Sequence, residues 1–120
     1  MCALQVATPT WWGENLQAAV RHPIKLKLSN KLVYSPHVYG PSVNNQPYFL
    51  DKTFPDNMPA IWQLQWAHVP HASDTPVVIG EWGGRFEGKD KIWQEKFAAF
   101  LADPANRIAG SFYCAHRLWS

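Results

Sequence analysis

Short runs of β type occur at three places along the chain. Residues 31–35 form the first run, and Pro36 ends it. Residues 76–80 are continuously apolar, a pattern typical of a strand that is buried on both faces in a parallel sheet. Residues 109–114 form the third run. The sequence therefore predicts three strands, and the second run favours a parallel arrangement.

Helical spacing occurs in the two stretches that separate these runs. In residues 58–69, Trp62, Trp66 and Val69 recur on one face, and Asn57 precedes them as a residue type that caps helices. The apolar stripe of the second stretch, residues 89–102, consists of Trp93, Phe97, Phe100 and Leu101. Strands that alternate with helices imply βαβ units with right-handed crossovers. We expect a segment of an α/β architecture, because three strands and two helices do not form a closed structure by themselves.

Composition and charge exclude several classes of protein. The chain has 120 residues, of which 47% are hydrophobic, so it is too apolar to be disordered and long enough for one compact unit. A net charge of +2 is too small to indicate binding to nucleic acid or to a membrane. The densest basic stretch, residues 21–31, alternates Lys with Leu and Ile, which favours a strand or a solvated edge over a phosphate site. No run reaches the ~18 apolar residues of a membrane span, and residues 1–10 lack the features of a signal peptide.

Cysteines and aromatic residues bear on the possible chemistry. Cys2 and Cys114 lie near opposite ends of the chain and have no metal-ligand spacing, so we predict neither a metal site nor a cofactor, and a disulfide between them stays open. Aromatic residues make up 14% of the chain. Such side chains serve cores first, but they also provide the flat surfaces on which sugar rings stack.

A carboxylate follows the continuously apolar run. Glu81 stands between Gly80 and Trp82, where the predicted strand ends. In parallel α/β folds, functional groups lie at the carboxyl ends of strands, and glycine allows the backbone to turn sharply or to approach a ligand. We interpret Glu81 as a candidate catalytic residue. The alternative is a carboxylate that caps a helix or pairs with a cation.

A second polar pair follows the first predicted strand. His37 and Tyr39 lie two residues apart, so their side chains point the same way if the chain stays extended. Together with Glu81, they form a plausible polar cluster at the carboxyl ends of two strands. The alternative is a hydrogen-bonded core histidine beside a packing tyrosine.

Four segments of the chain follow one another in a specific order. They are residues 11–16 (Trp-Trp-Gly-Glu-Asn-Leu), 33–40 (Val-Tyr-Ser-Pro-His-Val-Tyr-Gly), 53–59 (Thr-Phe-Pro-Asp-Asn-Met-Pro) and 77–83 (Val-Val-Ile-Gly-Glu-Trp-Gly). In this order they resemble glycoside hydrolase family 5, the cellulase-type (β/α)8 barrels. They are similar, in turn, to the loop after the fifth strand, the sixth strand, the entry to the next helix and the seventh strand. The resemblance extends from Trp11 to about Tyr113.

The resemblance implies a fold, an activity and a set of roles. The fold is a partial (β/α)8 TIM barrel of about strands six to eight, with residues 1–120 as an incomplete catalytic domain. The activity is retaining, endo-acting hydrolysis of the O-glycosyl bonds of β-1,4-glucan such as cellulose, with mannan and xylan still open, and family members are usually secreted. The partner is a polysaccharide or oligosaccharide substrate. Glu81 takes the role of nucleophile, and the implied substrate-binding residues are His37, Tyr39, Trp82, Trp11 and Trp12.

The family's second catalytic residue has no counterpart in the sequence. A retaining glycosidase needs an acid/base carboxyl group, which the family places after an Asn at the end of the fourth strand. No Asn-Glu pair occurs here, and Glu14, the first carboxylate of the chain, falls in the segment similar to the loop after the fifth strand. Residues 114–120 also depart from the family, so Trp119 receives no role. We therefore expect a partial or frameshifted gene product that is inactive by itself.

Two alternatives to a hydrolase fragment remain. The first is a non-catalytic carbohydrate-binding protein derived from the same barrel, which keeps the aromatic platforms and has lost the acid/base. The second is an unrelated α/β interaction module in which Glu81 is a structural cap. The second alternative has to explain four family-like segments in the right order by chance.

Overall fold

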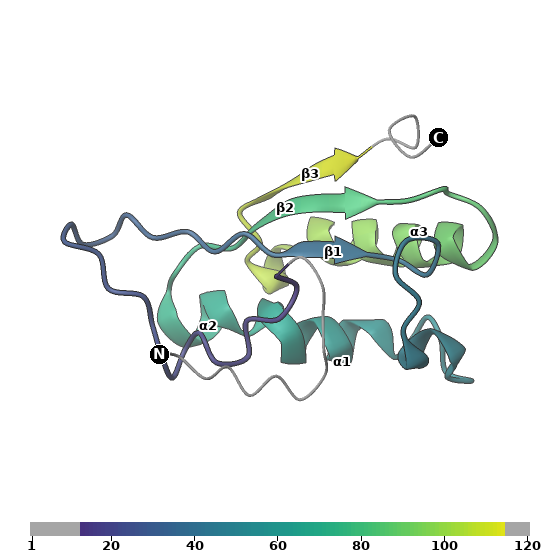
Figure 1. Cartoon of the computed structure of the whole chain (residues 1–120), viewed down its shortest axis with the longest axis horizontal. Helices are drawn as coiled ribbons and strands as arrows, with labels where there is room; N and C mark the ends of the chain where they lie inside the picture. The colour runs from purple at the N-terminus through teal and green to yellow at the C-terminus, as the bar shows by residue number, and fades with distance from the viewer. Residues whose placement is uncertain (1–12, 115–120) are drawn as a thin grey trace.

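A parallel sheet packed against helices forms the part of the chain that the computed structural model describes, residues 13–114. The strands lie in the order β1-β2-β3, and both neighbouring pairs are parallel (Figure 1). Their bounds are β1 His37–Tyr39, β2 Val78–Gly83 and β3 Gly110–Cys114. The parallel sheet that the sequence predicts is confirmed.

Helices occupy both crossovers between the strands. The connection from β1 to β2 contains the 3-10 helix η1 (Pro47–Leu50), α1 (Met58–Trp62), the π-helical segment η2 (Gln63–Ala67) and α2 (Val69–Ser73). The connection from β2 to β3 contains α3 (Gly88–Ala102) and the 3-10 helix η3 (Pro104–Asn106). The chain therefore contains two consecutive βαβ units, as the alternating pattern predicts.

The first strand lies later in the chain than predicted. Within residues 31–35, only Tyr34 pairs with the sheet, through an isolated bridge to Val77. The carbonyl oxygen of Pro36 accepts a hydrogen bond from the Gly80 amide at 2.9 Å, but proline has no N–H to donate in return. Regular pairing consequently begins only after Pro36, and β1 is the segment that carries the candidate site residues.

The predicted helix over residues 58–69 is interrupted and extends further. A π-helical segment separates α1 from α2, and α2 continues to Ser73, where Asp74 adopts a left-handed conformation (φ 53°). Pro70 explains the interruption, because it lacks the N–H that an α-helix requires at this position and its ring crowds the preceding turn. The α-helical ladder therefore does not pass unbroken through this region.

Asn57 precedes α1 but does not cap it with its side chain. Its amide group instead donates a hydrogen bond to the carbonyl oxygen of Tyr48, at 2.9 Å. The predicted capping interaction is therefore wrong. The side chain ties the start of α1 to η1 of the long connection.

An aromatic cluster forms the core between the sheet and the helices. Trp62 makes ring contacts with Trp93, Phe97 and Phe100 at centroid distances of 6.2, 4.8 and 5.0 Å. Both predicted apolar stripes are confirmed, because their residues are buried or, for Leu101, packed against the buried cluster. Much of the high aromatic content therefore serves packing, each ring burying a large apolar area.

One face of the sheet is less covered than the sequence predicts. In and beside β2, Val77 and Ile79 are fully buried, whereas Val78 between them is only half-buried. The helices pack on the face of Val77 and Ile79, where the aromatic core lies. The expectation of a strand buried equally on both faces is not met within the described residues, and the more open face is the one available for chemistry.

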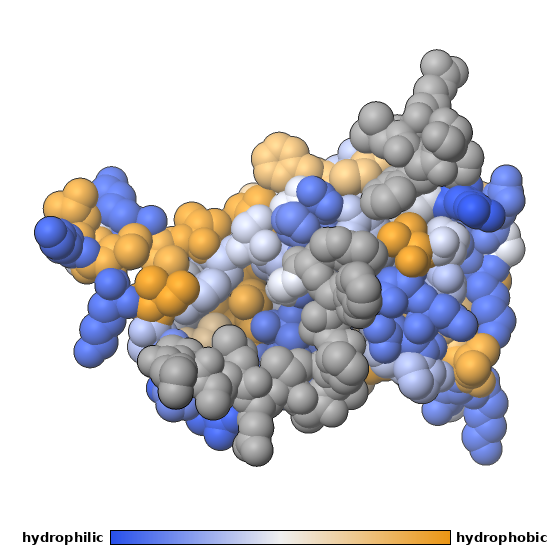
Figure 2. Space-filling view, viewed as in Figure 1, coloured by the Kyte–Doolittle hydropathy of each residue, from blue (hydrophilic) through white to orange (hydrophobic). Residues whose placement is uncertain are grey.

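Apolar side chains also gather at one end of the molecule. Ile24, Leu26, Leu28 and Val33 are exposed on the segment that precedes β1, and Figure 2 shows hydrophobic surface gathered at the left end of the molecule. Residues 21–31 are solvated, as one interpretation of the alternating pattern expects, but they form an exposed loop and contain no strand. No helix in residues 13–114 is long and apolar enough to cross a membrane.

Candidate active site

Glu81 is the centre of a polar cluster on the sheet. The hydroxyl group of Tyr39 donates a hydrogen bond to Glu81 Oε2 at 2.5 Å. The ring nitrogen Nδ1 of His37 lies 3.4 Å from the same oxygen. The structure therefore brings together three residues that the sequence predicts to lie close, from two different strands.

The register of the parallel strands accounts for this proximity. His37 pairs with Glu81, and Tyr39 pairs with Gly83 one step further along. Alternate residues of a strand point to the same face, so His37 and Tyr39 both reach the carboxylate. Val38 between them points into the core and is fully buried.

A β-bulge in β2 determines the face on which Glu81 lies. The register between β2 and β3 shifts between Ile79 and Trp82, because two residues of β2 oppose a single residue of β3. Strict alternation from the buried Ile79 places Glu81 in the helix-facing core. The extra residue reverses this direction, as bulges beside active sites commonly do. The bulge thus turns the carboxylate to the open face.

Gly80 within the bulge leaves room for the side chains of β1. A Cβ atom at this position meets Ser35 Oγ at 2.4 Å and His37 Nε2 at 2.8 Å, closer than real contacts allow. The sequence suggests that Gly80 lets the backbone turn or approach a ligand. In the structure, its missing side chain lets the His37 ring and Ser35 pack against β2. Ser35 carries no signal in the sequence that marks it for this position.

We expect Gly80→Ala to destabilise the fold by about 1 to 3 kcal/mol, because the added methyl group overpacks the site. Gly110→Ala is the matched control, since a Cβ there has no atom within 4 Å, and its expected effect is below about 0.5 kcal/mol. Urea denaturation of both variants measures the difference. Equal stabilities would show that β1 adjusts freely around position 80.

Tyr39 is held in its protonated form. Its side chain is buried, with 5% of the residue exposed. Burial, followed by the hydrogen bond to Glu81, raises the pKa of the phenol far above its ordinary value, and the nearby thiol of Cys114 adds to the effect. The hydroxyl group therefore remains a donor at neutral pH and fixes the orientation of the carboxylate. Cys114 itself is a free cysteine in the structure.

The carboxylate remains accessible to a ligand. The side chain of Glu81 is 44% exposed and that of His37 is 32% exposed. One carboxylate oxygen is engaged by Tyr39 and His37, which fixes the orientation of the group. Such a carboxylate can attack an electrophilic carbon, or stabilise positive charge that develops beside it. Within residues 13–114, no group of three or more His, Cys, Asp and Glu side chains could hold a metal ion.

Trp82 lies on the opposite face of β2. Its ring packs edge-on against Phe97 at 5.3 Å and against Tyr113 at 4.9 Å, and its backbone pairs with the buried Val38. The structure does not bring Trp82 into the cluster of Glu81, because the two residues are neighbours in an extended strand. The other two predicted sugar platforms, Trp11 and Trp12, lie outside the described residues, so their roles stay predictions.

Glu14 differs from Glu81 in its surroundings. It is 4% exposed, and burial raises its pKa to about 8. Tyr48 lies near enough that the charge of Glu14 contributes, after burial, to raising the pKa of the phenol. A buried carboxyl group of this kind is protonated at neutral pH and belongs to the packing of the N-terminal segment.

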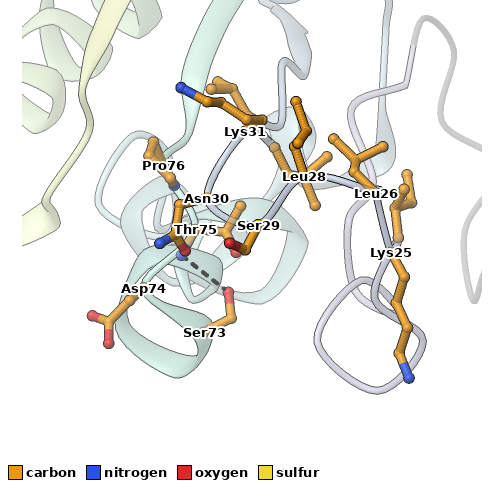
Figure 3. Close-up of a pocket in the computed structure, with 13 residues that line it drawn as sticks. Lys25, Leu26, Leu28, Ser29, Asn30, Lys31, Ser73, Asp74, Thr75 and Pro76 are labelled. Carbon is orange, nitrogen blue, oxygen red and sulfur yellow. Dashed lines mark hydrogen bonds between the residues drawn. The ribbon is translucent and has the colours of Figure 1, made fainter.

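A separate hollow of about 770 Å³ lies at the other end of the strands. Segments that precede β1 and β2, residues 24–33 and 73–76, line it (Figure 3). The side chains of Lys25 and Lys31 point away from each other, so they do not converge on an anion. Active sites of parallel α/β folds lie at the carboxyl ends of the strands, which is where Glu81 is found and this hollow is not.

Comparisons with known proteins agree on one family. The model of the family described as Cellulase (glycosyl hydrolase family 5) matches residues 3–115. An endoglucanase of Paenibacillus polymyxa is 48% identical over 109 residues, which are 86% of this chain and 26% of that protein. The major extracellular endoglucanase of Xanthomonas campestris is 39% identical over 94 residues, covering 76% of this chain and 19% of that protein.

Solved structures give the same result. An endocellulase of Pyrococcus horikoshii in complex with cellotetraose superposes with a TM-score of 0.78 and 44% sequence identity, over 88% of this chain and 28% of that chain. The catalytic domain of the major endoglucanase of Xanthomonas campestris superposes with a TM-score of 0.75 and 37% identity. The chain thus spans about a quarter of the length of these structures.

The fold and the site define a class of protein. A parallel sheet with helices in its crossovers, and a carboxylate on its open face, is consistent with part of a (β/α)8 barrel of a glycosidase. The chain belongs to glycosyl hydrolase family 5, the cellulase family.

Proposed function

We propose that Glu81 is the catalytic nucleophile of a retaining, endo-acting β-1,4-glucanase site. One observation carries the proposal: a half-exposed carboxylate whose Oε2 is held by Tyr39 and faced by His37. A nucleophile has to present an ionised oxygen in a fixed direction, and a tyrosine donor from the next strand provides that direction. His37 and Tyr39 then act on the carboxylate and on the sugar hydroxyl groups beside it.

The proposed reaction proceeds in two displacements. Glu81 attacks the anomeric carbon, the glycosidic C–O bond breaks, and a glycosyl-enzyme ester forms. An acid on the other side of the bond protonates the departing oxygen, and the same group then activates the water that hydrolyses the ester. Tyr39 and His37 keep the attacking oxygen in line during the first step and stabilise the carboxylate when it is released in the second.

We propose that β1, β2 and β3 correspond to strands six to eight of the barrel. The acid/base then belongs to another part of the barrel. Glu14 does not replace it, because it is only 4% exposed, and this burial keeps its carboxyl group away from a bound substrate. We therefore propose that the 120-residue chain holds one half of the catalytic pair and does not turn over substrate by itself. The missing proton donor leaves the barrier for departure of the leaving group high.

The proposed substrate is a cellulose-type glucan. The names of the relatives, endoglucanase and endocellulase, support this class, as does the cellotetraose bound to the Pyrococcus horikoshii protein. We also propose an extracellular location, which is supported by the major extracellular endoglucanase of Xanthomonas campestris.

A hybrid enzyme tests the proposal. Residues 13–114 replace the matching segment of the Paenibacillus polymyxa endoglucanase, so that the relative supplies the rest of the barrel. We expect the hybrid to hydrolyse soluble cellulose with retention of the anomeric configuration, as seen by NMR of the first product, and the 120-residue chain to show no turnover. A correctly folded hybrid without activity contradicts the proposal. If that hybrid still binds cellotetraose saturably, a non-catalytic carbohydrate-binding role is favoured instead.

A further inference from the structure

A second carboxylate is buried beyond the ends of β1 and β2. Asp90 lies in the first turn of α3 and is 3% exposed. Its oxygens accept hydrogen bonds from the backbone N–H of Ser42 at 3.3 Å, from the backbone N–H of Phe86 at 3.0 Å and from the side-chain amide of Gln94 at 2.6 Å. A buried carboxylate with three donors is strongly anchored, because each donor compensates part of its lost hydration.

The two backbone donors belong to the loops that leave the site. Ser42 follows Tyr39 by three residues, and Phe86 follows Glu81 by five. Asp90 therefore joins the loop after β1 to the loop after β2, and it does so from the helix that packs behind both strands. Ser42 strengthens the connection, because its Oγ accepts a hydrogen bond from the backbone N–H of Arg85 at 3.1 Å.

Two glycines bring these loops into contact with the carboxylate. A Cβ at Gly40 lies 2.7 Å from Asp90 Oδ1, and a Cβ at Gly84 lies 2.7 Å from Asp90 Oδ2. Neither position accommodates a side chain without displacing the carboxylate. The loops after Tyr39 and after Glu81 are thus both packed directly onto Asp90.

Strand pairing holds the site over only a short length of chain. β1 is three residues long, and its paired segment ends at Tyr39 itself. Without a further constraint beyond Tyr39, a strand this short frays at its end, and the hydroxyl group then moves relative to Glu81. The Asp90 contacts provide such a constraint, because they hold the loops that follow Tyr39 and Glu81 in the chain.

We propose that Asp90 is a positioning residue, which holds the ends of β1 and β2 together so that Tyr39 stays against Glu81. The inference rests on the proposed function, in which that contact aims the nucleophile. Asp90 does not touch the substrate, and its effect reaches the reaction through the two loops. Loss of the carboxylate lowers the fraction of molecules whose Glu81 is aligned for attack.

Three variants separate positioning from mere stability. Asp90→Ala removes every contact, and Asp90→Asn keeps the volume and an acceptor oxygen. Gln94→Met is the matched control: it removes a buried hydrogen bond to the same carboxylate from the same helix, but leaves both loop contacts in place. Thermal denaturation gives the melting temperature of each variant, so that activities are compared below the temperature at which any of them unfolds.

The first measurement uses the 120-residue chain. The hydroxyl proton between Tyr39 and Glu81 is expected to give a downfield NMR resonance that disappears in Tyr39→Phe. We expect it to be lost in Asp90→Ala, restored in part in Asp90→Asn and retained in Gln94→Met. A folded Asp90→Ala chain that retains the resonance overturns the proposal.

The second measurement uses the hybrid enzyme and applies even where a variant of the short chain does not fold. Asp90→Ala is expected to lower kcat on the order of 10²-fold, the cost of a small misplacement of reacting groups, while KM changes less than about threefold. Asp90→Asn recovers part of kcat, and Gln94→Met stays within about threefold of the unsubstituted hybrid. Equal losses in Asp90→Ala and Gln94→Met overturn positioning but leave the proposed function intact, whereas an inactive parent hybrid contradicts the function itself.

Discussion

We expect Glu81→Gln to lower the kcat of the hybrid enzyme by at least about 10⁴-fold, because the proposed role of Glu81 is that of the nucleophile and loss of a nucleophile is among the most costly substitutions in an enzyme. The amide has nearly the same shape as the carboxylate and still accepts the Tyr39 hydrogen bond. It cannot form the glycosyl-enzyme ester, because a neutral amide oxygen is a weak nucleophile. Initial rates on a soluble cellulose derivative, and on an aryl cellobioside, measure the loss.

Glu95→Gln is the matched control for this loss. Glu95 carries the same charge on the exposed face of α3, where its carboxylate lies 3.9 Å from Lys91, and its substitution should leave kcat unchanged within about twofold. A large loss in both variants would trace the effect to net charge or folding. Retained activity in Glu81→Gln would remove Glu81 from the mechanism altogether.

Azide distinguishes a nucleophile from an acid/base at this position. Glu81→Gly opens a space beside the anomeric carbon, and azide there attacks the carbon as the aryloxide of an activated β-cellobioside departs. The C–N bond forms on the face that Glu81 occupied, so the product is the α-glycosyl azide, inverted relative to the substrate. A β-glycosyl azide would mean that azide had entered from the leaving-group side, which is the result expected if Glu81 were the acid/base.

Local pattern was sufficient to predict α3 of this chain. The stripe of Trp93, Phe97 and Phe100 repeats at helical spacing, and α3 spans Gly88–Ala102 against an expected 89–102. The first helical connection was less predictable, since Pro70 breaks the ladder and the chain passes through a π-helical segment. Periodicity identifies the buried face of such a segment but not the hydrogen-bond pattern along it.

For the cluster around Glu81, the sequence was sufficient to predict which three residues meet, but not how they are arranged. His37, Tyr39 and Glu81 could be grouped because residues after parallel strands meet at one edge. The face on which the Glu81 side chain lies could not be predicted, because it depends on a β-bulge. A β-bulge is a register shift between two strands, and β2 and β3 are distant in sequence. The role of Asp90 has no signature in the sequence for the same reason, because its partners Ser42 and Phe86 become its neighbours only in the folded chain.

Glu14→Gln changes how the stability of the chain depends on pH. Burial raises the pKa of Glu14 from its ordinary value of 4.5 to about 8 in the folded protein. Below about pH 4.5 the carboxyl group is protonated in both the folded and the unfolded state. Between these two values the folded protein keeps a proton that the unfolded chain releases, so the free energy of unfolding decreases as the pH rises.

The expected slope from this group is about −1.4 kcal/mol per pH unit in the interval between pH 5 and 8. Above pH 8 the group ionises in both states, and its contribution levels off. Glutamine has no proton to lose, so Glu14→Gln removes the slope and is expected to be more stable than the parent chain by roughly 2 to 4 kcal/mol at pH 7.5. Urea denaturation of both proteins at a series of pH values gives the difference curve.

Glu95→Gln again provides the control, because Glu95 is an exposed carboxylate. Its difference curve is expected to be flat over the same interval, because this substitution leaves the buried Glu14 unchanged. A flat curve for Glu14→Gln as well would mean that Glu14 is already ionised in the folded chain at pH 5. It would then have to be solvated or paired with a cation, in contrast to the buried group that the structure describes.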